Sequence, residues 1–182
     1  KQAGLQPSFD LTANQDQVRA FFLDRLKQLF TGEKLRHDIV DAVTDTQGVD
    51  IANVIEAAQA IDSHKDDTNF KGAVEALTRV LRIAKKGKFG ATMPKVNPDL
   101  FVNPSEQQLY DAVNAVEQQF ADRTVAENFT ALRGLAPVIT AYFDENMIMD
   151  KDEAVRQNRL AQLTILARLA AVVGNLNDLI VK

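Results

Sequence analysis

Residues 70–86 read FKGAVEALTRVLRIAKK, and this stretch indicates both the fold class and the most unusual surface of the chain. Its apolar residues recur at spacings of three and four, the period of one face of an α-helix, while cations occupy the opposite side. The apolar side is formed by Phe70, Val74, Leu77, Leu81 and Ala84. The opposite side carries Lys71, Arg79, Arg82 and Lys86. We therefore predict an amphipathic helix that turns a basic face to solvent.

The helical period continues on both sides of this stretch. The predicted helices before it cover 14–30, 35–44 and 49–61. Those after it cover 103–120, 125–133, 137–144 and 150–174. No alternating strand pattern and no glycine-rich phosphate loop interrupts the series. We therefore predict an all-α fold, a helical bundle.

One long irregular loop, over residues 87–104, divides the predicted bundle. Two glycines and three prolines interrupt any helix there. The helical parts 14–86 and 104–180 are expected to join across this loop into a single domain over residues 1–182. Phe89, Met93 and Phe101 are the apolar residues expected to hold the loop against the body.

The composition describes a soluble globular domain. The chain has 182 residues, of which 46% are apolar and 25% charged, and its uncharged stretches are too short and too polar to cross a membrane. It has no cysteine, which excludes disulfides and thiolate chemistry and fits a reducing compartment, so we expect a cytoplasmic protein. The first residue is Lys1 rather than methionine, and we interpret the chain as a fragment of a longer protein.

The charge is distributed unevenly along the chain. The net charge of −4 argues against attraction of the whole surface to nucleic acid. Between Glu75 and Asp99, however, there is no acidic residue. That interval contains Arg79, Arg82, Lys85, Lys86, Lys88 and Lys95, and without these six cations 15 basic residues face 25 acidic ones. One surface patch is therefore expected to be basic on an otherwise acidic protein.

A row of cations three and four residues apart has the geometry to follow an RNA phosphate backbone, and an adjacent ring such as Phe89 offers a stacking platform for an unpaired base. The same row is also compatible with an ordinary solvated helix face. A second candidate is the pair Arg156 and Arg159, close to the turn over residues 145–149. There we expect Met147, Ile148 and Met149 to close the core, and the alternatives for the two arginines are an ion pair, with Asp152 for Arg156, or a phosphate contact.

Two other functions compete with RNA binding. A helical protein-interaction module would dock another subunit through its apolar stripes and loop, and would expose contiguous apolar residues around Phe89, Met93 and Phe101. A metal-dependent hydrolase centred on His37-Asp38 would need more histidine ligands than the two in the chain, so we interpret that pair as helix surface or helix-terminus contacts and expect no metal site.

Residues 142–149 read YFDENMIM, and residues 156–161 read RQNRLA. Together they resemble a C-terminal signature of the bacterial glycyl-tRNA synthetase beta subunits, in which a Phe-Asp pair leads to a Val-Met turn and then to Arg-x-Asn-Arg-Leu at the last helix. The segments FFLDRL, RHDIVDAV and RVLRI at residues 21–26, 36–43 and 79–83 resemble further elements of that domain in the same order. Ile148 and the pair Leu81-Arg82 depart from the family pattern.

The resemblance implies an anticodon-binding domain akin to the helical domains of arginyl- and cysteinyl-tRNA synthetases. Its implied partners are the anticodon arm of glycine-specific tRNA and a separate alpha subunit, with neither membrane nor DNA as a target. The domain itself would be non-catalytic and would hold no cofactor. ATP and Mg²⁺ would act in the whole enzyme, where the alpha subunit activates glycine and transfers it to tRNA.

Charge patterning and position, rather than the resemblance, select the individual RNA contacts. Arg79, Arg82, Lys85, Lys86 and Lys88 are expected to contact phosphates, with Phe89 as the stacking ring. Arg156 and Arg159 are expected to form a second contact point. Arg25, Lys27 and Arg36, from the first two helices, complete the predicted set.

Overall fold

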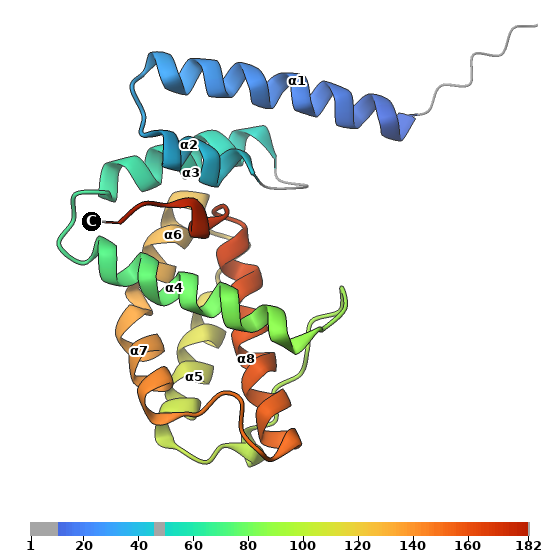
Figure 1. The fold of residues 1–182 in the computed structure, drawn as a ribbon, viewed down its shortest axis with the longest axis vertical. Helices are drawn as coiled ribbons and strands as arrows, with labels where there is room; N and C mark the ends of the chain where they lie inside the picture. Colours follow the sequence, from blue (N-terminus) through green and yellow to red (C-terminus); the bar gives the residue numbers. More distant parts are fainter. Residues whose placement is uncertain (1–10, 46–49, 182) are drawn as a thin grey trace, which may run out of the picture.

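The computed structural model describes the backbone of residues 11–45 and 50–181, and the side chains of residues 17–45 and 50–181. Over those ranges the protein is all-helical, which confirms the predicted fold class (Figure 1). The α-helices are α1 (Leu11–Gly32), α2 (His37–Thr44), α3 (Ile51–His64), α4 (Phe70–Ala84), α5 (Pro104–Gln118), α6 (Val125–Gly134), α7 (Ala136–Glu145) and α8 (Glu153–Ala171). Three short 3₁₀ helices are η1 (Lys85–Gly87), η2 (Pro98–Leu100) and η3 (Leu176–Asp178).

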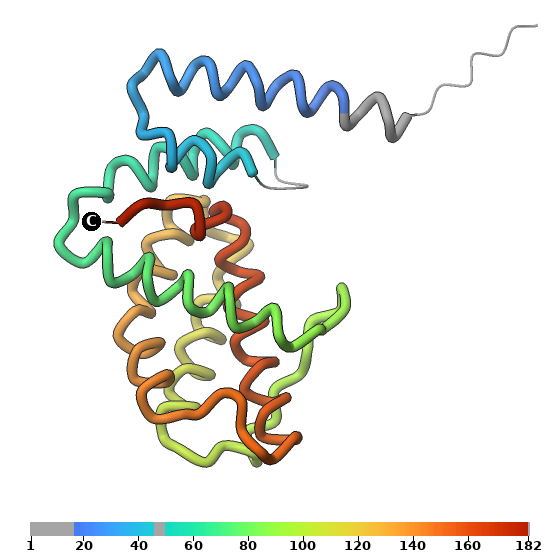
Figure 2. The backbone as a smooth tube through the Cα atoms, in the orientation of Figure 1, coloured from blue at the N-terminus to red at the C-terminus, as the bar shows by residue number. Residues whose placement is uncertain are grey.

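The helices form a bundle with an extension at one end. Helix α4 crosses the bundle and packs on α7 and α8, α5 packs on α7, and α6 connects the bundle to α3. Helices α2 and α3 lie at one end of this bundle, and α1 lies on the side of α2 and α3 that faces away from the bundle. The N-terminal half of α1 projects past α2 and α3 (Figure 1). The C-terminal segment returns between α2 and the bundle (Figure 2).

One apolar core joins the parts of the chain before and after the loop. Leu77 and Val80 of α4 are fully buried together with Leu132, Leu163 and Leu166 of the later helices. The predicted parts 14–86 and 104–180 are therefore separated by the loop in sequence but share their packing.

Residues 88–97 form an irregular connection that is held by specific contacts. Arg168 of α8 donates hydrogen bonds to the carbonyl oxygens of Gly90 and Ala91. The side chain of Asn158 contacts both the backbone N–H and the carbonyl of Asn97, at 2.7 and 3.0 Å. These contacts make the loop a fixed part of the bundle surface.

The C-terminal segment requires a glycine where it meets α2. Gly174 has a φ of +149°, and a Cβ at this position would lie 2.7 Å from the carbonyl oxygen of Ala42. That same oxygen accepts a hydrogen bond from the N–H of Asn175 at 2.7 Å. Only glycine allows this close approach without strain.

Two apolar patterns fold differently from the prediction. In the turn before α8 only Ile148 enters the core, whereas Met147 and Met149 are 73% and 48% exposed, so the expectation that all three close the core is wrong for the methionines. The backbone is extended at Asn146, and successive side chains of an extended segment point to opposite sides. The apolar stripe of α1 also divides, because Leu26 and Phe30 are buried while Phe22 and Leu29 are exposed.

Candidate nucleic-acid interface

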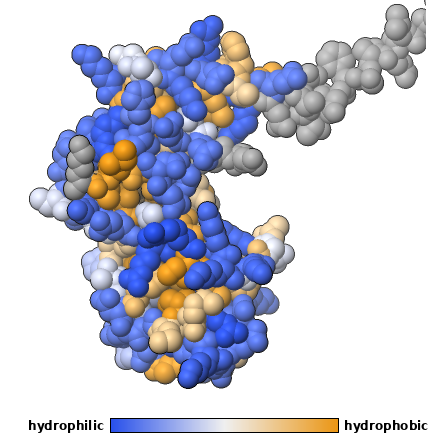
Figure 3. Space-filling view, in the orientation of Figure 1, coloured by the Kyte–Doolittle hydropathy of each residue, from blue (hydrophilic) through white to orange (hydrophobic). Residues whose placement is uncertain are grey.

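The predicted basic row forms a continuous exposed edge at the C-terminal end of α4. Arg79 and Arg82 lie on its outer side, Lys85 and Lys86 continue into η1, and Lys88 follows with a left-handed φ of 49°. All five residues are exposed. Strongly hydrophilic side chains gather over α4 in the space-filling view (Figure 3). The structure therefore brings these five predicted residues together.

The row is not neutralised by neighbouring acids. Among the described residues, none of its five cations forms an ion pair. Arg79 instead stacks its guanidinium over the ring of Phe143, 4.1 Å from the ring centroid, in a cation–π contact. Because no described acid lies within ion-pair distance of these five cations, their positive charge is not paired locally.

A shallow pocket of about 280 Å³ adjoins the row at Lys85. Leu81 contributes apolar surface to its lining, and Asn175 and Asn177 contribute side-chain amides. Asp45 also borders it and accepts a hydrogen bond from Asn175 at 3.3 Å. The sequence analysis did not include the two asparagines, because they lie about 90 residues from Lys85 along the chain and share no motif with it.

Phe89 is placed differently from the predicted stacking ring. It is partly buried against the core, and a Cβ added at Gly87 would lie 2.5 Å from the Phe89 ring. Phe101 is also partly buried, with its ring centroid 5.7 Å from that of Tyr110. The expectation of a free platform at Phe89 is therefore corrected, because the ring anchors the loop. The contiguous exposed patch that the interaction-module alternative predicted is likewise not formed by these two rings.

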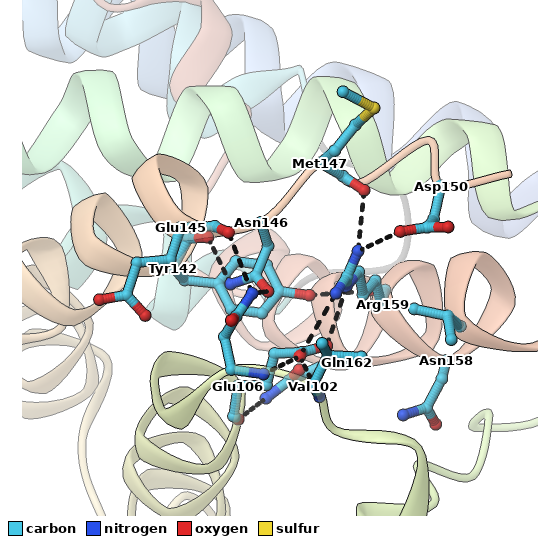
Figure 4. A network of polar contacts seen from close by, with 12 residues as sticks. Val102, Glu106, Tyr142, Glu145, Asn146, Met147, Asp150, Asn158, Arg159 and Gln162 are labelled. Atoms are coloured by element: carbon cyan, nitrogen blue, oxygen red, sulfur yellow. Dashed lines mark hydrogen bonds and ion pairs between the residues drawn. The ribbon is translucent and has the colours of Figure 1, made fainter. Parts of the chain in front are cut away.

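Arg159 is buried rather than exposed, at 3%, and lies inside a polar network (Figure 4). Its Nε lies 2.9 Å from Oε1 of Glu106, which is itself fully buried. Its Nη1 lies 3.0 Å from Oδ2 of Asp150 and 3.0 Å from the carbonyl oxygen of Met147. The predicted phosphate contact is wrong for Arg159, because protein groups already occupy its donors.

The network holds Glu106 ionised in the interior. Burial alone would raise the pKa of Glu106, but the hydrogen bond from Arg159 and the backbone N–H groups of Asn103 and Val102 outweigh it and keep that pKa below its usual value. Burial would lower the pKa of Arg159, and Glu106 reverses that effect. The ion pair therefore fixes the start of α5 to α8 and to the turn at Met147.

Arg156 is tied locally as well. Its Nη1 donates to the carbonyl oxygen of Asp150 at 2.7 Å, and its Nη2 lies 3.6 Å from the carboxylate of Glu153. The predicted pair with Asp152 does not form, because the Asp152 carboxylate instead caps α8 by accepting from the backbone N–H groups of Ala154 and Val155.

The predicted residues of the first two helices do not join the row. Arg25 and Lys27 are exposed on α1, which α2 and α3 separate from α4 (Figure 1). Arg25 lies 5.5 Å over the ring of Phe21 and donates to Gln28. Arg36 pairs with Asp38 and donates to the carbonyl oxygen of Ile180, so it fastens the C-terminal segment.

Asp38 makes contacts at the start of α2, whereas His37 lies on the helix surface, and both environments were predicted as alternatives for the pair. Asp38 is buried and accepts from Arg36 at 3.0 Å and from the N–H of Ile180 at 2.7 Å. Burial acts to raise the pKa of Asp38, but these contacts lower it overall. His37 is exposed. Within 11–45 and 50–181, no group of three or more histidine or acidic side chains is arranged to hold a metal ion.

No helix of the described part is both long and apolar enough to span a bilayer. The molecule is therefore an all-helical domain with a row of exposed cations at the C-terminal end of α4. A family model described as the DALR anticodon binding domain matches residues 73–176, more than half of the chain. The chain belongs to this family. The match includes the whole basic row and Arg159, and it leaves α1, α2 and α3 outside.

Curated relatives extend the similarity to those first helices. The chain is 60% identical over 180 residues to a protein named glycine--tRNA ligase beta subunit from Limosilactobacillus reuteri (strain DSM 20016), which covers 99% of this chain and 26% of the relative. A protein of the same name from Lacticaseibacillus casei (strain BL23) is 47% identical over 184 residues, and this similarity covers 100% of this chain and 26% of the relative. The chain thus spans about a quarter of the length of these relatives.

Proposed function

We propose that the chain is the anticodon-binding part of a glycine--tRNA ligase beta subunit and that it binds the anticodon arm of glycine-specific tRNA. The observation that carries the proposal is the coincidence of the basic row, residues 79–88, with the family match over residues 73–176. The row is also exposed and without acidic partners among the described residues.

Phosphate binding is the first step of the proposed recognition. Arg82, Lys85 and Lys86 lie one helical turn or less apart, so they follow an RNA backbone along the end of α4. Each phosphate that they neutralise releases counterions, and the affinity for RNA falls as the salt concentration rises. Such contacts orient the RNA without reading its sequence.

Base recognition is assigned to the pocket beside Lys85. Its volume of about 280 Å³ is sufficient for one unpaired base. The Asn177 amide donates to Oδ1 of Asn175 at 3.0 Å, so its own Oδ1 is the acceptor offered to the edge of such a base, while Leu81 contacts the face of the base. Asn177→Ala is therefore expected to weaken the preference for the native loop while leaving the salt dependence unchanged.

The remaining functions belong to the whole enzyme. We propose that an alpha subunit carries the catalytic site for ATP- and Mg²⁺-dependent activation of glycine, and that the complete ligase works in the cytoplasm. This chain then contributes tRNA binding and no catalytic residue.

The test is a titration of the chain with the anticodon stem-loop of glycine tRNA and with a copy whose anticodon bases are exchanged. Each is measured at two salt concentrations. Tighter binding of the native loop supports anticodon recognition. Salt-sensitive binding without preference leaves a phosphate contact only, and no binding at concentrations where the intact ligase binds favours a protein-interaction module.

A charge-reversal pair locates the interface. Arg82→Glu with Lys86→Glu is expected to lower the affinity at least about tenfold and to reduce the salt slope by about 1.5, because two phosphate contacts are lost. Lys34→Glu with Lys71→Glu makes the same change of charge at exposed positions outside the row and serves as the control. Equal effects of the two pairs would remove the row from the interface.

A further inference from the structure

Helix α1 presents more apolar surface than the neighbouring helices cover. Its inner side is formed by Leu26 and Phe30, which are buried against the core. Its outer side consists of Val18, Phe21, Phe22 and Leu29, which are 54%, 57%, 47% and 51% exposed. These four residues are spaced as one face of a helix, and we call them the outer face of α1.

The outer face is a mainly apolar stripe that also contains Arg25, whose guanidinium lies 5.5 Å over the ring of Phe21. Phe21 and Phe22 contact each other edge to face, with ring centroids 5.9 Å apart. Helix α1 also extends past α2 and α3 (Figure 1), and Val18 and Phe21 toward its N-terminal end are more than half exposed. Isolated exposed apolar residues are common, whereas a contiguous apolar helix face points to a contact.

The outer face is large enough for a specific contact. With roughly 200 Å² for a whole Phe side chain, the four residues expose roughly 400 Å² of apolar surface, close to the apolar share of the ~800 Å² that each partner buries in a standard interface. A partner in the same polypeptide needs no larger area than this, because the tether supplies a high effective concentration. A second copy and a separate protein are outcomes that the test below distinguishes from it.

Relatives that include α1 are long enough to supply such a tethered partner. The similarity at 60% identity covers 99% of this chain but only 26% of the relative, whereas the family match starts after α3. Helix α1 is thus shared with the longer subunits and lies outside the matched RNA-binding module. We infer that the outer face of α1 packs against another part of the same beta-subunit polypeptide, outside these 182 residues.

This inference rests on the proposed membership of the chain in a longer subunit, and its test is independent of RNA. Amide hydrogen exchange of α1 is compared between the full-length beta subunit and the isolated chain. In the full-length subunit we expect α1 amides to exchange at least about tenfold more slowly, while α8 amides exchange equally in both. Phe22→Ser with Leu29→Ser should abolish that difference.

The control is Asp24→Ser with Lys27→Ser, which introduces the same helix-weakening residue on the opposite, polar side of α1. It should leave the extra protection in place. Equal exchange of α1 in the two proteins would overturn the inference. So would a dimer of the isolated chain that Phe22→Ser with Leu29→Ser dissociates, or protection that arises only after the alpha subunit is added.

The outcome is separable from the test of RNA binding. Phe22→Ser with Leu29→Ser is expected to leave stem-loop affinity of the isolated chain unchanged, since α1 lies across α2 and α3 from the basic row. If the reversal of Arg82 and Lys86 leaves RNA binding intact while α1 remains protected in the full-length subunit, the proposed interface fails and the docking of α1 stands.

Discussion

Two regions of this protein carry arginines on a helix, and the structure gives them opposite environments. At the C-terminal end of α4, Arg79 and Arg82 are exposed and form no ion pair with a described residue. In the first turns of α8, Arg159 is 3% exposed and contacts Glu106 and Asp150. A side chain of the same type is therefore available to a ligand in one region and part of the folded framework in the other.

The source of the difference is a distant acid. Glu106 of α5 lies 53 residues before Arg159 along the chain and reaches it because α5 packs on α8. No described acid reaches the end of α4 in the same way. Helical spacing alone predicts the same exposure for the arginines of α4 and of α8. Tertiary packing determines which of them are buried and which remain exposed.

The largest predicted effect is a loss of stability on substitution of the buried Arg159. Arg159→Met should lower the free energy of unfolding by about 3–5 kcal/mol, because it leaves the buried Glu106 carboxylate without its cation. Urea denaturation followed by circular dichroism measures the change. Arg156→Met is the control on the same helix and should cost less than about 2 kcal/mol, since it removes one hydrogen bond to the Asp150 carbonyl and an ion pair whose Glu153 carboxylate is exposed. A similar small cost for both would mean that the network contributes little to stability.

The buried region should also respond to acid. The pKa of Glu106 is lowered in the folded protein, so its contribution to stability is complete above its ordinary pKa of 4.5 and is lost as the pH falls through the lower folded value. Asp38 has its pKa lowered as well and acts in the same direction. We expect the free energy of unfolding to decrease between about pH 5 and pH 3.

Glu106→Gln tests the assignment of that pH dependence. The variant should be less stable at neutral pH and should lose less stability on acidification, because one group with a lowered pKa is removed. Thermal unfolding at several pH values measures both quantities. An unchanged acid slope in Glu106→Gln would assign the dependence to other carboxylates.

Much of the helical fold was predictable because its signals are local. The apolar period of residues 70–84 predicted α4, and the helix predicted over 150–174 contains α8 at Glu153–Ala171. The elements that pack on a helix face, by contrast, come from distant parts of the sequence. The single apolar stripe predicted over residues 14–30 divides into a buried side at Leu26 and an exposed side at Phe22, since periodicity identifies apolar faces but not the elements that cover them.

The candidate site was predictable to the same extent. The absence of acids between Glu75 and Asp99 correctly indicated that the cations there form no ion pair within the described part of the chain. The burial of Arg159 and the packing of Phe89 depend on residues far away in the sequence, and no spacing rule contained them. The asparagines of the adjacent pocket lie at the other end of the chain and meet Lys85 only after folding.

A smaller effect distinguishes two residues within the exposed region. Arg79→Ala should lower the free energy of unfolding by about 0.5–1 kcal/mol, because it removes the cation–π contact with Phe143. Arg79→Lys keeps the charge but not the planar guanidinium, and should recover only part of that loss. Chemical denaturation of the two variants gives both values. Full stability of Arg79→Ala would indicate that the stacking on Phe143 does not contribute to stability, so that Arg79 would resemble Arg82 in this respect.

The smallest effect on the fold is expected at Arg82. Arg82→Gln should change the free energy of unfolding by less than about 0.5 kcal/mol, because the side chain is exposed and has no ion-pair partner among the described residues. Its effect on RNA should be clear nonetheless, with the slope of log affinity against log salt reduced by about 0.7–0.9 for one lost phosphate contact. Stem-loop titrations over a salt series measure that slope. A loss of stability without a change in slope would place Arg82 with Arg159, as a structural arginine, and would leave the phosphate contacts to the lysines of η1.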